Sequence, residues 1–219
     1  MTSVLDALRA DLCRLHAELP RNGLVAWTSG NLSARVPGED LMVVKASGIT
    51  FEALTPAAMV VCDLDGLLVE GDLAPSSDAA THGYVYQHLP HVGGVAHTHS
   101  AYATAWAARG EPIPCVLTAM ADEFGGAIPI GPFALIGDAE IGRGIVGTLR
   151  DHRSPAVLMR SHGVFTIGTR PVDAIKAAVM CEDVARTVHL ARALGDPIQL
   201  DAKDIDALYD RYQNVYGQR

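Results

Sequence analysis

Short apolar segments bounded by turn residues alternate along this chain with longer segments of helical character. The predicted strands are 42–44, 59–62, 67–69, 92–98 and 156–160. The predicted helices are 5 to about 20, 76–88, 100–108, 141–150, 172–194 and 204–212. Such interleaving is typical of the α/β class. The turn sequence at 63–66, Asp-Leu-Asp-Gly, predicts an antiparallel strand pair. We therefore expect an α/β fold with a mixed sheet.

Nothing in the 219 residues marks a boundary between domains. We find no repeat, low-complexity run or linker, and a chain of this length suits one domain. Apolar residues make up 49% and charged residues 19%, a balance that provides a full hydrophobic core. We therefore expect residues 1–219 to form a single domain.

The charge of the chain excludes some partners. With 17 basic and 25 acidic residues the formal charge is −8, and no Lys/Arg cluster offsets it, so we expect no nucleic-acid partner. The first 20 residues carry charges throughout, and no segment approaches the roughly 20 apolar residues of a membrane span. The four cysteines are scattered without a CxxC pair, which indicates reduced thiols. We expect a cytoplasmic protein with no membrane partner.

Two histidines two positions apart, His97 and His99, end the apolar segment 92–98. Side chains alternate between faces along a strand, so both imidazoles point the same way and one ion can bridge them. A third ligand is available in His162, which follows the strand 156–160 and precedes Gly163, a residue that permits a sharp turn. Three neutral imidazoles leave one position open, as in catalytic zinc sites. The alternative is that these are ordinary hydrogen-bonded histidines. We expect further histidines at the surface, among them His16, His88 and His152.

Three segments combine Gly, Ser, Thr or Asn in ways that expose backbone N–H groups: 28–31, 45–48 and 75–77. The last one opens a predicted helix, whose free N–H groups and dipole attract an anion. Lys45 adds a positive charge to the second segment. Taken singly, each such segment is more often just a turn or a cap.

Two carboxylates are candidates for chemistry. Asp78 follows the serine pair at 76–77, where it either favours the helix dipole, completes a metal site or acts as a base. Asp122 lies in a predicted loop bounded by glycine and either moves protons or is a solvated carboxylate.

Six motifs occur in the order of a known family: SGNLSAR (29–35), KASGIT (45–50), PSSD (75–78), HTHS (97–100), SHG (161–163) and YGQ (216–218). In these motifs the chain resembles the class II aldolase/adducin family. The resemblance implies a three-layer α/β/α domain and a homotetramer with active sites at subunit contacts. It also implies one zinc ion per subunit, held by His97, His99 and His162. The positions matching the phosphate-binding residues of the family are Gly30, Asn31, Ser47, Gly48, Ser76 and Ser77.

The same resemblance implies retro-aldol chemistry on a sugar phosphate. Asp78, Asp122 in the pattern A-D-x-F, and Tyr216 in Y-G-Q match the family's L-ribulose-5-phosphate 4-epimerases. The fuculose-phosphate aldolases carry Glu in place of Asp78. The epimerases also have a His before the closing tyrosine, which is missing here. Either Tyr209 or Arg211 replaces it, or the enzyme is an aldolase of the L-fuculose-1-phosphate type. Asp122 and Tyr216 are the candidates for proton transfer. A dehydratase of the same fold and a non-catalytic adducin-like scaffold are further alternatives.

Overall fold

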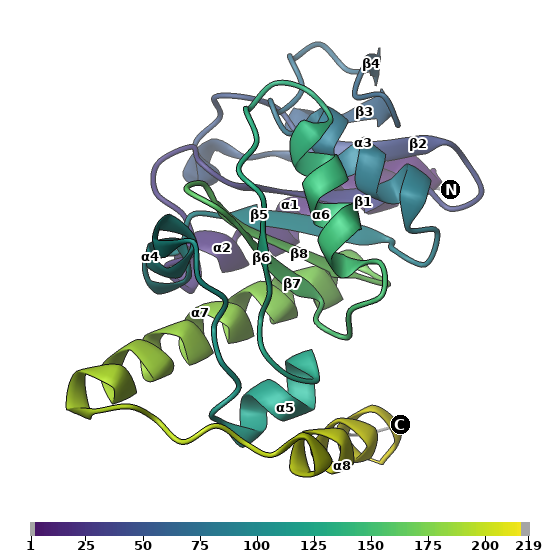
Figure 1. Ribbon diagram of the computed structural model, residues 1–219. Helices are drawn as coiled ribbons and strands as arrows, with labels where there is room; N and C mark the ends of the chain where they lie inside the picture. The colour runs from purple at the N-terminus through teal and green to yellow at the C-terminus, as the bar shows by residue number, and fades with distance from the viewer. Residues whose placement is uncertain (1–2, 216–219) are drawn as a thin grey trace.

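One mixed sheet of eight strands runs through the molecule, in the order β4-β3-β2-β1-β5-β8-β7-β6 (Figure 1). A computed structural model describes residues 3–215. The strands are β1 (Asn31–Arg35), β2 (Leu41–Lys45), β3 (Met59–Asp63), β4 (Leu68–Glu70), β5 (Gly94–Thr98), β6 (Ile130–Gly131), β7 (Ala156–Met159) and β8 (Gly163–Gly168). Within this described part, β6 and β7 are parallel and the other neighbours are antiparallel. The mixed sheet is therefore confirmed.

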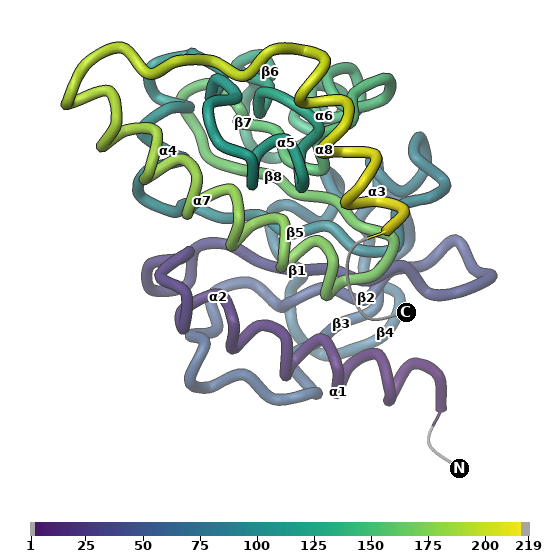
Figure 2. The backbone as a smooth tube through the Cα atoms, turned by 90° about the horizontal axis from the view of Figure 1, so that it is seen from below, coloured from purple at the N-terminus to yellow at the C-terminus, as the bar shows by residue number. Residues whose placement is uncertain are grey.

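Helices cover both faces of the sheet. They are α1 (Val4–His16), α2 (Glu18–Arg21), α3 (Ala79–His88), α4 (Ala101–Arg109), α5 (Thr118–Phe124), α6 (Glu140–Leu149), α7 (Pro171–Leu194) and α8 (Ala202–Asn214), with short 3-10 turns at Phe51–Ala53 and Pro56–Ala58. Figure 2 shows α1 and α7 crossing one face, while α3 and α6 pack on the other. The expected three layers are confirmed.

Strands β2 and β5 are mainly apolar on both sides because both of their faces are buried. In β2, Val44 packs in the cluster under α3 and α6, whereas its neighbour Val43 packs in the cluster under α1 and α7. In β5, Val95 and Ala96 divide between the same two clusters. Alternation of side chains thus buries the two faces of these strands in separate clusters. A third cluster joins α4, α5 and α7 to β7 and β8. None of the helices in residues 3–215 is both long and apolar enough to cross a membrane.

Several elements differ from the sequence prediction, among them the short strand β6, where we expected no strand. Strand β1 begins inside the segment 28–31 that we interpreted as a loop, and its polar residues hid its strand character. Strand β8 starts directly after the histidine turn, where we expected no further strand. The segment around Asp122 is helix α5, not a loop. The glycine that bounds it, Gly125, ends this helix with a φ of 62°. All four cysteines are free thiols.

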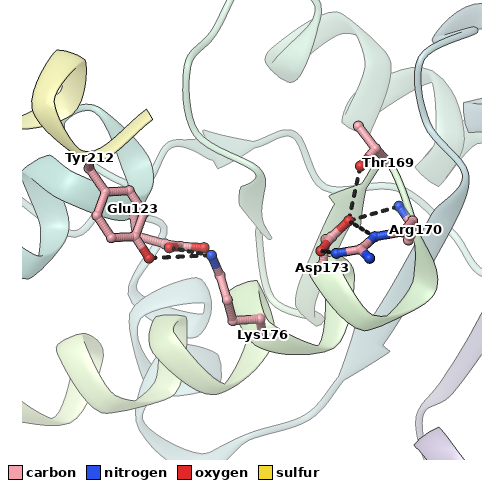
Figure 3. Close-up of polar contacts among 6 residues, drawn as sticks. All are labelled: Glu123, Thr169, Arg170, Asp173, Lys176 and Tyr212. Carbon is pink, nitrogen blue, oxygen red and sulfur yellow. Dashed lines mark hydrogen bonds and ion pairs between the residues drawn. The ribbon is translucent and has the colours of Figure 1, made fainter. Parts of the chain in front are cut away.

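Charged and polar contacts join helices α5 and α8 to α7 (Figure 3). Glu123 of α5 is 2.9 Å from the Lys176 ammonium of α7, and that ammonium also donates to the Tyr212 hydroxyl of α8 at 3.4 Å. At the start of α7, the Asp173 carboxylate accepts hydrogen bonds from Thr169 and Arg170. The Lys176 contacts hold α5 and α8 against α7, and the Asp173 contacts stabilise the first turn of α7.

Candidate active site

The three predicted metal histidines converge. His97 lies in β5, His99 follows it directly, and His162 lies in the turn between β7 and β8. Strands β5 and β8 are antiparallel neighbours, so this turn lies beside the end of β5. The Nε2 atoms of His97 and His99 are 2.9 Å apart, and one ring nitrogen of each of the three residues lies within 4.8 Å of the others.

Neighbouring groups orient the His97 ring. Its Nδ1–H donates to the Val164 carbonyl at 2.9 Å, so the Nε2 lone pair of the neutral ring is directed toward His99. The Phe165 ring stacks on that of His97 with centroids 4.0 Å apart and an angle of 11°. Burial lowers the pKa of His97 to about 3 and lowers the pKa of His99 and His162 as well. All three imidazoles are therefore neutral, the form that binds metal.

The donor set fits a zinc-like ion. Two imidazole nitrogens at 2.9 Å require an ion or a proton between them, and the buried Nδ1 of His162 has no hydrogen-bond partner in residues 3–215. Three imidazoles are a ligand set typical of catalytic zinc.

The turn that carries His162 differs from expectation in its geometry. Ser161, not Gly163, has the left-handed backbone, with a φ of 58°. Gly163 is needed for another reason, because a Cβ there would lie 2.6 Å from the Thr98 carbonyl oxygen. Glycine at 163 thus allows β8 to approach β5 closely enough for the imidazoles to meet.

A cavity of about 290 Å³ opens beside the histidines. Its lining includes the seven predicted phosphate residues, Gly30, Asn31, Lys45, Ser47, Gly48, Ser76 and Ser77, together with Asp78 and the three histidines. Backbone hydrogen bonds join the segments: Ser47 N–H donates to Ala74, and Ser76 N–H donates to Lys45. Strand pairing places the first segment beside the histidines, since Asn31 lies opposite His97. Three N–H-rich segments distant in sequence therefore form one pocket.

Lys45 is unusual for a charged residue because only 2% of it is exposed. Its ammonium donates to the Ala46 carbonyl at 3.3 Å and lies 5.5 Å from the centre of the Phe51 ring. Burial lowers the pKa of Lys45. A buried cation at the wall of the pocket favours an anionic ligand.

Asp78 is buried at the N-terminus of α3, but its side chain makes no capping hydrogen bond. Its carboxylate instead accepts from the Asn31 amide at 2.6 Å, and the same amide nitrogen donates to the Ser76 hydroxyl at 3.0 Å. Burial opposes ionisation, but the His97 and His82 rings and the Asn31 hydrogen bond outweigh it and lower the pKa of Asp78. The site thus contains an ionised carboxylate beside the imidazoles.

Of the residues proposed for proton transfer, those that the structure describes do not line this pocket. Asp122 does not line it, and its carboxylate oxygens are instead each 3.3 Å from the guanidinium of Arg211 on α8. Tyr209 lines a different cavity, with the Arg153 guanidinium 5.1 Å from its ring centre. Tyr216 lies outside the described residues.

Two other histidines correct the sequence interpretation. His16 is fully buried, not exposed, because its ring bridges the Leu12 carbonyl at 2.7 Å and the Leu32 N–H at 3.1 Å. His88 and His152 are exposed as expected. We missed His82, which is buried one helical turn after Asp78. His82 lies four positions after Asp78, and this helical spacing from a candidate carboxylate was the signal available in the sequence.

The chain has recognisable relatives. Residues 10–189 match the family described as the class II aldolase and adducin N-terminal domain. The chain belongs to this family. L-ribulose-5-phosphate 4-epimerase UlaF of Salmonella paratyphi B is 40% identical over 199 residues, which cover 87% of each chain. Among solved structures, an L-fuculose 1-phosphate aldolase superposes with a TM-score of 0.86 at 26% identity, covering 94% of this chain and 96% of that one. YgbL from Klebsiella pneumoniae superposes with a TM-score of 0.80 at 27% identity, covering 95% and 99%.

Proposed function

We propose that this chain is a zinc-dependent sugar-phosphate enzyme that breaks and re-forms a carbon–carbon bond, and that its activity is L-ribulose-5-phosphate 4-epimerase. The observation that carries the proposal is one cavity that combines three converging imidazoles with three N–H-rich segments. Such a cavity suits a small molecule with a phosphate at one end and oxygen ligands at the other. The similarity to UlaF supports the choice of substrate.

In the mechanism, zinc bound by His97, His99 and His162 would supply Lewis-acid chemistry at the substrate carbonyl. The backbone N–H groups of the pocket and the Lys45 ammonium hold the phosphate, which positions the reacting carbons. The ionised Asp78 carboxylate is placed either to complete the metal site or to accept the hydroxyl proton whose loss starts cleavage. The electron pair of the broken bond stays on the carbonyl fragment.

The step after cleavage separates epimerase from aldolase. In an epimerase the aldehyde rotates and is added back on its other face, whereas in an aldolase the carbonyl fragment is protonated and the aldehyde leaves. We propose Asp122 and Tyr216 for the proton transfers. Since Asp122 does not line the pocket of its own chain, this role requires the pocket of another subunit. It therefore goes together with a homotetramer whose active sites lie at subunit contacts.

The aldolase is the second candidate, supported by the missing histidine and by the similarity to L-fuculose 1-phosphate aldolase. Arg211 is the better replacement for that histidine, because it contacts Asp122 while Tyr209 lies against Arg153. A single domain over residues 1–219 and a cytoplasmic location complete the proposal.

A pair of assays tests the activity. Purified protein is supplied with L-ribulose 5-phosphate, and D-xylulose 5-phosphate and free aldehyde are measured in parallel. We expect xylulose product without accumulation of aldehyde. Rapid aldehyde release with no xylulose product would replace the epimerase with an aldolase.

The phosphate pocket leads to a first prediction. Replacing Ser76 and Ser77 together by alanine will raise KM about 10²- to 10⁴-fold, because two hydrogen bonds to a charged group together contribute about 3–6 kcal/mol. Steady-state kinetics will measure the change. Ser154→Ala is the control, since this buried serine bonds Ala156 outside the pocket. An unchanged KM in the double variant would mean that the serines are only a turn.

A second prediction concerns Asp122. Asp122→Asn will lower kcat for epimerisation by about 10²-fold or more, the usual contribution of a general acid or base, with little change in KM. Asp206→Asn is the control. Asp206 lies on α8, the helix that carries Arg211, and forms an exposed ion pair with Arg153. Equal kinetics in the two variants would exclude a role for Asp122 in proton transfer.

A further inference from the structure

Helix α4 begins directly after a candidate metal ligand. His99 is followed by Ser100, the N-cap of the helix, and then by the first helical residue, Ala101. The N–H groups in the first turn of a helix have no partners within the helix, and a serine N-cap usually accepts one of them. The Ser100 side chain does not, and its buried hydroxyl has no hydrogen-bond partner in the described part of the chain. The cap of α4 must therefore come from another element.

That cap is the carboxylate of Glu182 on α7. One of its oxygens accepts from the Tyr102 N–H and the other from the Ala103 N–H, each at 2.9 Å. Tyr102 and Ala103 are the second and third residues of α4, the positions whose N–H groups a capping side chain normally accepts. Both bonds end on a charged acceptor, and the negative charge also favours the dipole of α4. Glu182 thus caps a helix that starts about 80 positions earlier in the sequence.

The surroundings of Glu182 hold its carboxylate in place. The side chain is half-buried, and Cys181 before it and Ala185 after it are fully buried in the cluster that joins α4 to α7. The Trp106 indole N–H donates to the Ala185 carbonyl at 3.3 Å. Helix α4 is therefore joined to α7 at its first turn by Glu182 and again one turn later by Trp106.

The other end of α4 supports the loop of a second candidate ligand. The Ala107 carbonyl accepts from the Ser161 N–H at 2.9 Å. Ser161 directly precedes His162 and has a φ of 58°, a left-handed backbone that residues other than glycine rarely adopt. One helix thus connects to two of the three candidate ligands, to His99 through the chain and to His162 through this hydrogen bond.

We propose that Glu182 is a positioning residue which, by capping α4, sets the positions of the His99 and His162 imidazoles. His97 lies within β5, and its ring is held by the Val164 carbonyl of the neighbouring strand. His99 and His162 lie outside the strands, in the two segments that α4 supports. The consequence for a metal rests on the proposed function, but the effect of Glu182 on the two imidazoles does not.

The first test compares ring signals in the metal-free protein. Glu182→Gln keeps the size of the side chain, but its NH₂ group cannot accept a hydrogen bond, so one of the two cap bonds is lost. Full-length ¹⁵N-labelled protein is treated with a chelator, and the imidazole ¹H–¹⁵N signals are recorded. We expect the signals of His99 and His162 to shift and those of His88, exposed on α3, to stay. Unchanged signals of His99 and His162 would overturn the proposal.

The second test measures the affinity for zinc by competition with a chelator. Glu182→Gln should bind zinc about 10- to 100-fold more weakly than the wild type, because this is the usual effect of removing a group that orients metal ligands. Glu182 does not line the cavity beside the histidines, so the change would not come from loss of a ligand. Wild-type zinc affinity in this variant would count against a positioning role.

Asp173→Asn is the matched control. Asp173 also caps a helix, since its carboxylate accepts from the Arg170 N–H at the start of α7, and it does not line the cavity beside the histidines. We expect it to lower Tm and to leave zinc affinity and the ring signals of His99 and His162 unchanged. Equal losses of zinc affinity in the two variants would mean that Glu182 acts only through overall stability. A wild type that binds no zinc would overturn the proposed function, and the ring signals would still decide the role of Glu182.

Discussion

His97→Ala will remove zinc from the purified protein and lower kcat by about 10³-fold, because Lewis-acid stabilisation contributes several kcal/mol to such reactions. His97 is the central ligand candidate, since its ring centroid is 4.6 Å from that of His99 and 4.8 Å from that of His162. Its loss leaves two of the three proposed imidazole ligands. Elemental analysis and steady-state kinetics will measure the two effects.

The control for this prediction is His88→Ala. His88 is exposed on α3, and its ring Nδ1–H donates a hydrogen bond to the Tyr84 carbonyl. It does not line the cavity. We expect one zinc ion per chain and wild-type kinetics in this variant. Stoichiometric zinc in a variant that lacks all three candidate histidines would refute the assignment.

Gly163→Ala will destabilise the protein and weaken its metal site together. The added Cβ would lie 2.6 Å from the Thr98 carbonyl oxygen, which is backbone and cannot rotate away. Forced overpacking of this kind costs about 1–3 kcal/mol, and each kcal/mol lowers Tm by about 2–4 °C in a chain of this size. Because β5 and β8 must separate, the imidazoles of His97 and His162 move apart and zinc affinity falls. Thermal denaturation and competition with a chelator will measure both changes.

Gly147→Ala is the matched control. Gly147 lies within α6, and a Cβ there would meet nothing within 4 Å. Alanine is favoured over glycine inside a helix by about 1 kcal/mol, so this variant should be at least as stable as the wild type. A Gly163→Ala protein with wild-type Tm and zinc affinity would show that the close approach of β8 to β5 is not required.

Most of the elements could be predicted because their signals are local. The apolar runs of β2, β3 and β5 and the turn after β3 identified strands, and leucines at helical spacing in residues 5–15 identified α1. Strand β1 escaped because its residues Asn31 and Ser33 are polar and buried, which the rule of apolar cores does not anticipate. Their reason to be polar is a set of hydrogen bonds to Asp78, His82 and Tyr86, and these bonds exist only in the folded protein.

The same difference applies to the candidate site. The spacing of His97 and His99 predicted a shared face, since the alternation of side chains along a strand is a property of neighbouring residues. Local residues already suggested His162 and the three N–H-rich segments, and the resemblance to a family assigned them their ligand and phosphate-binding roles. The position of Asp122 could not be predicted, because α5 is placed by its contacts with α7 and α8.

The sequence by itself thus determined the α/β class, the pair of histidines and the N–H-rich segments, all of which depend on residues close together in the chain. The tertiary structure decided that they form one site. Pairing of β1 with β5 places Asn31 opposite His97, and pairing of β5 with β8 places Phe165 beneath the same ring. Hydrogen bonds between strands far apart in sequence set that register, and no local pattern of residues encodes it.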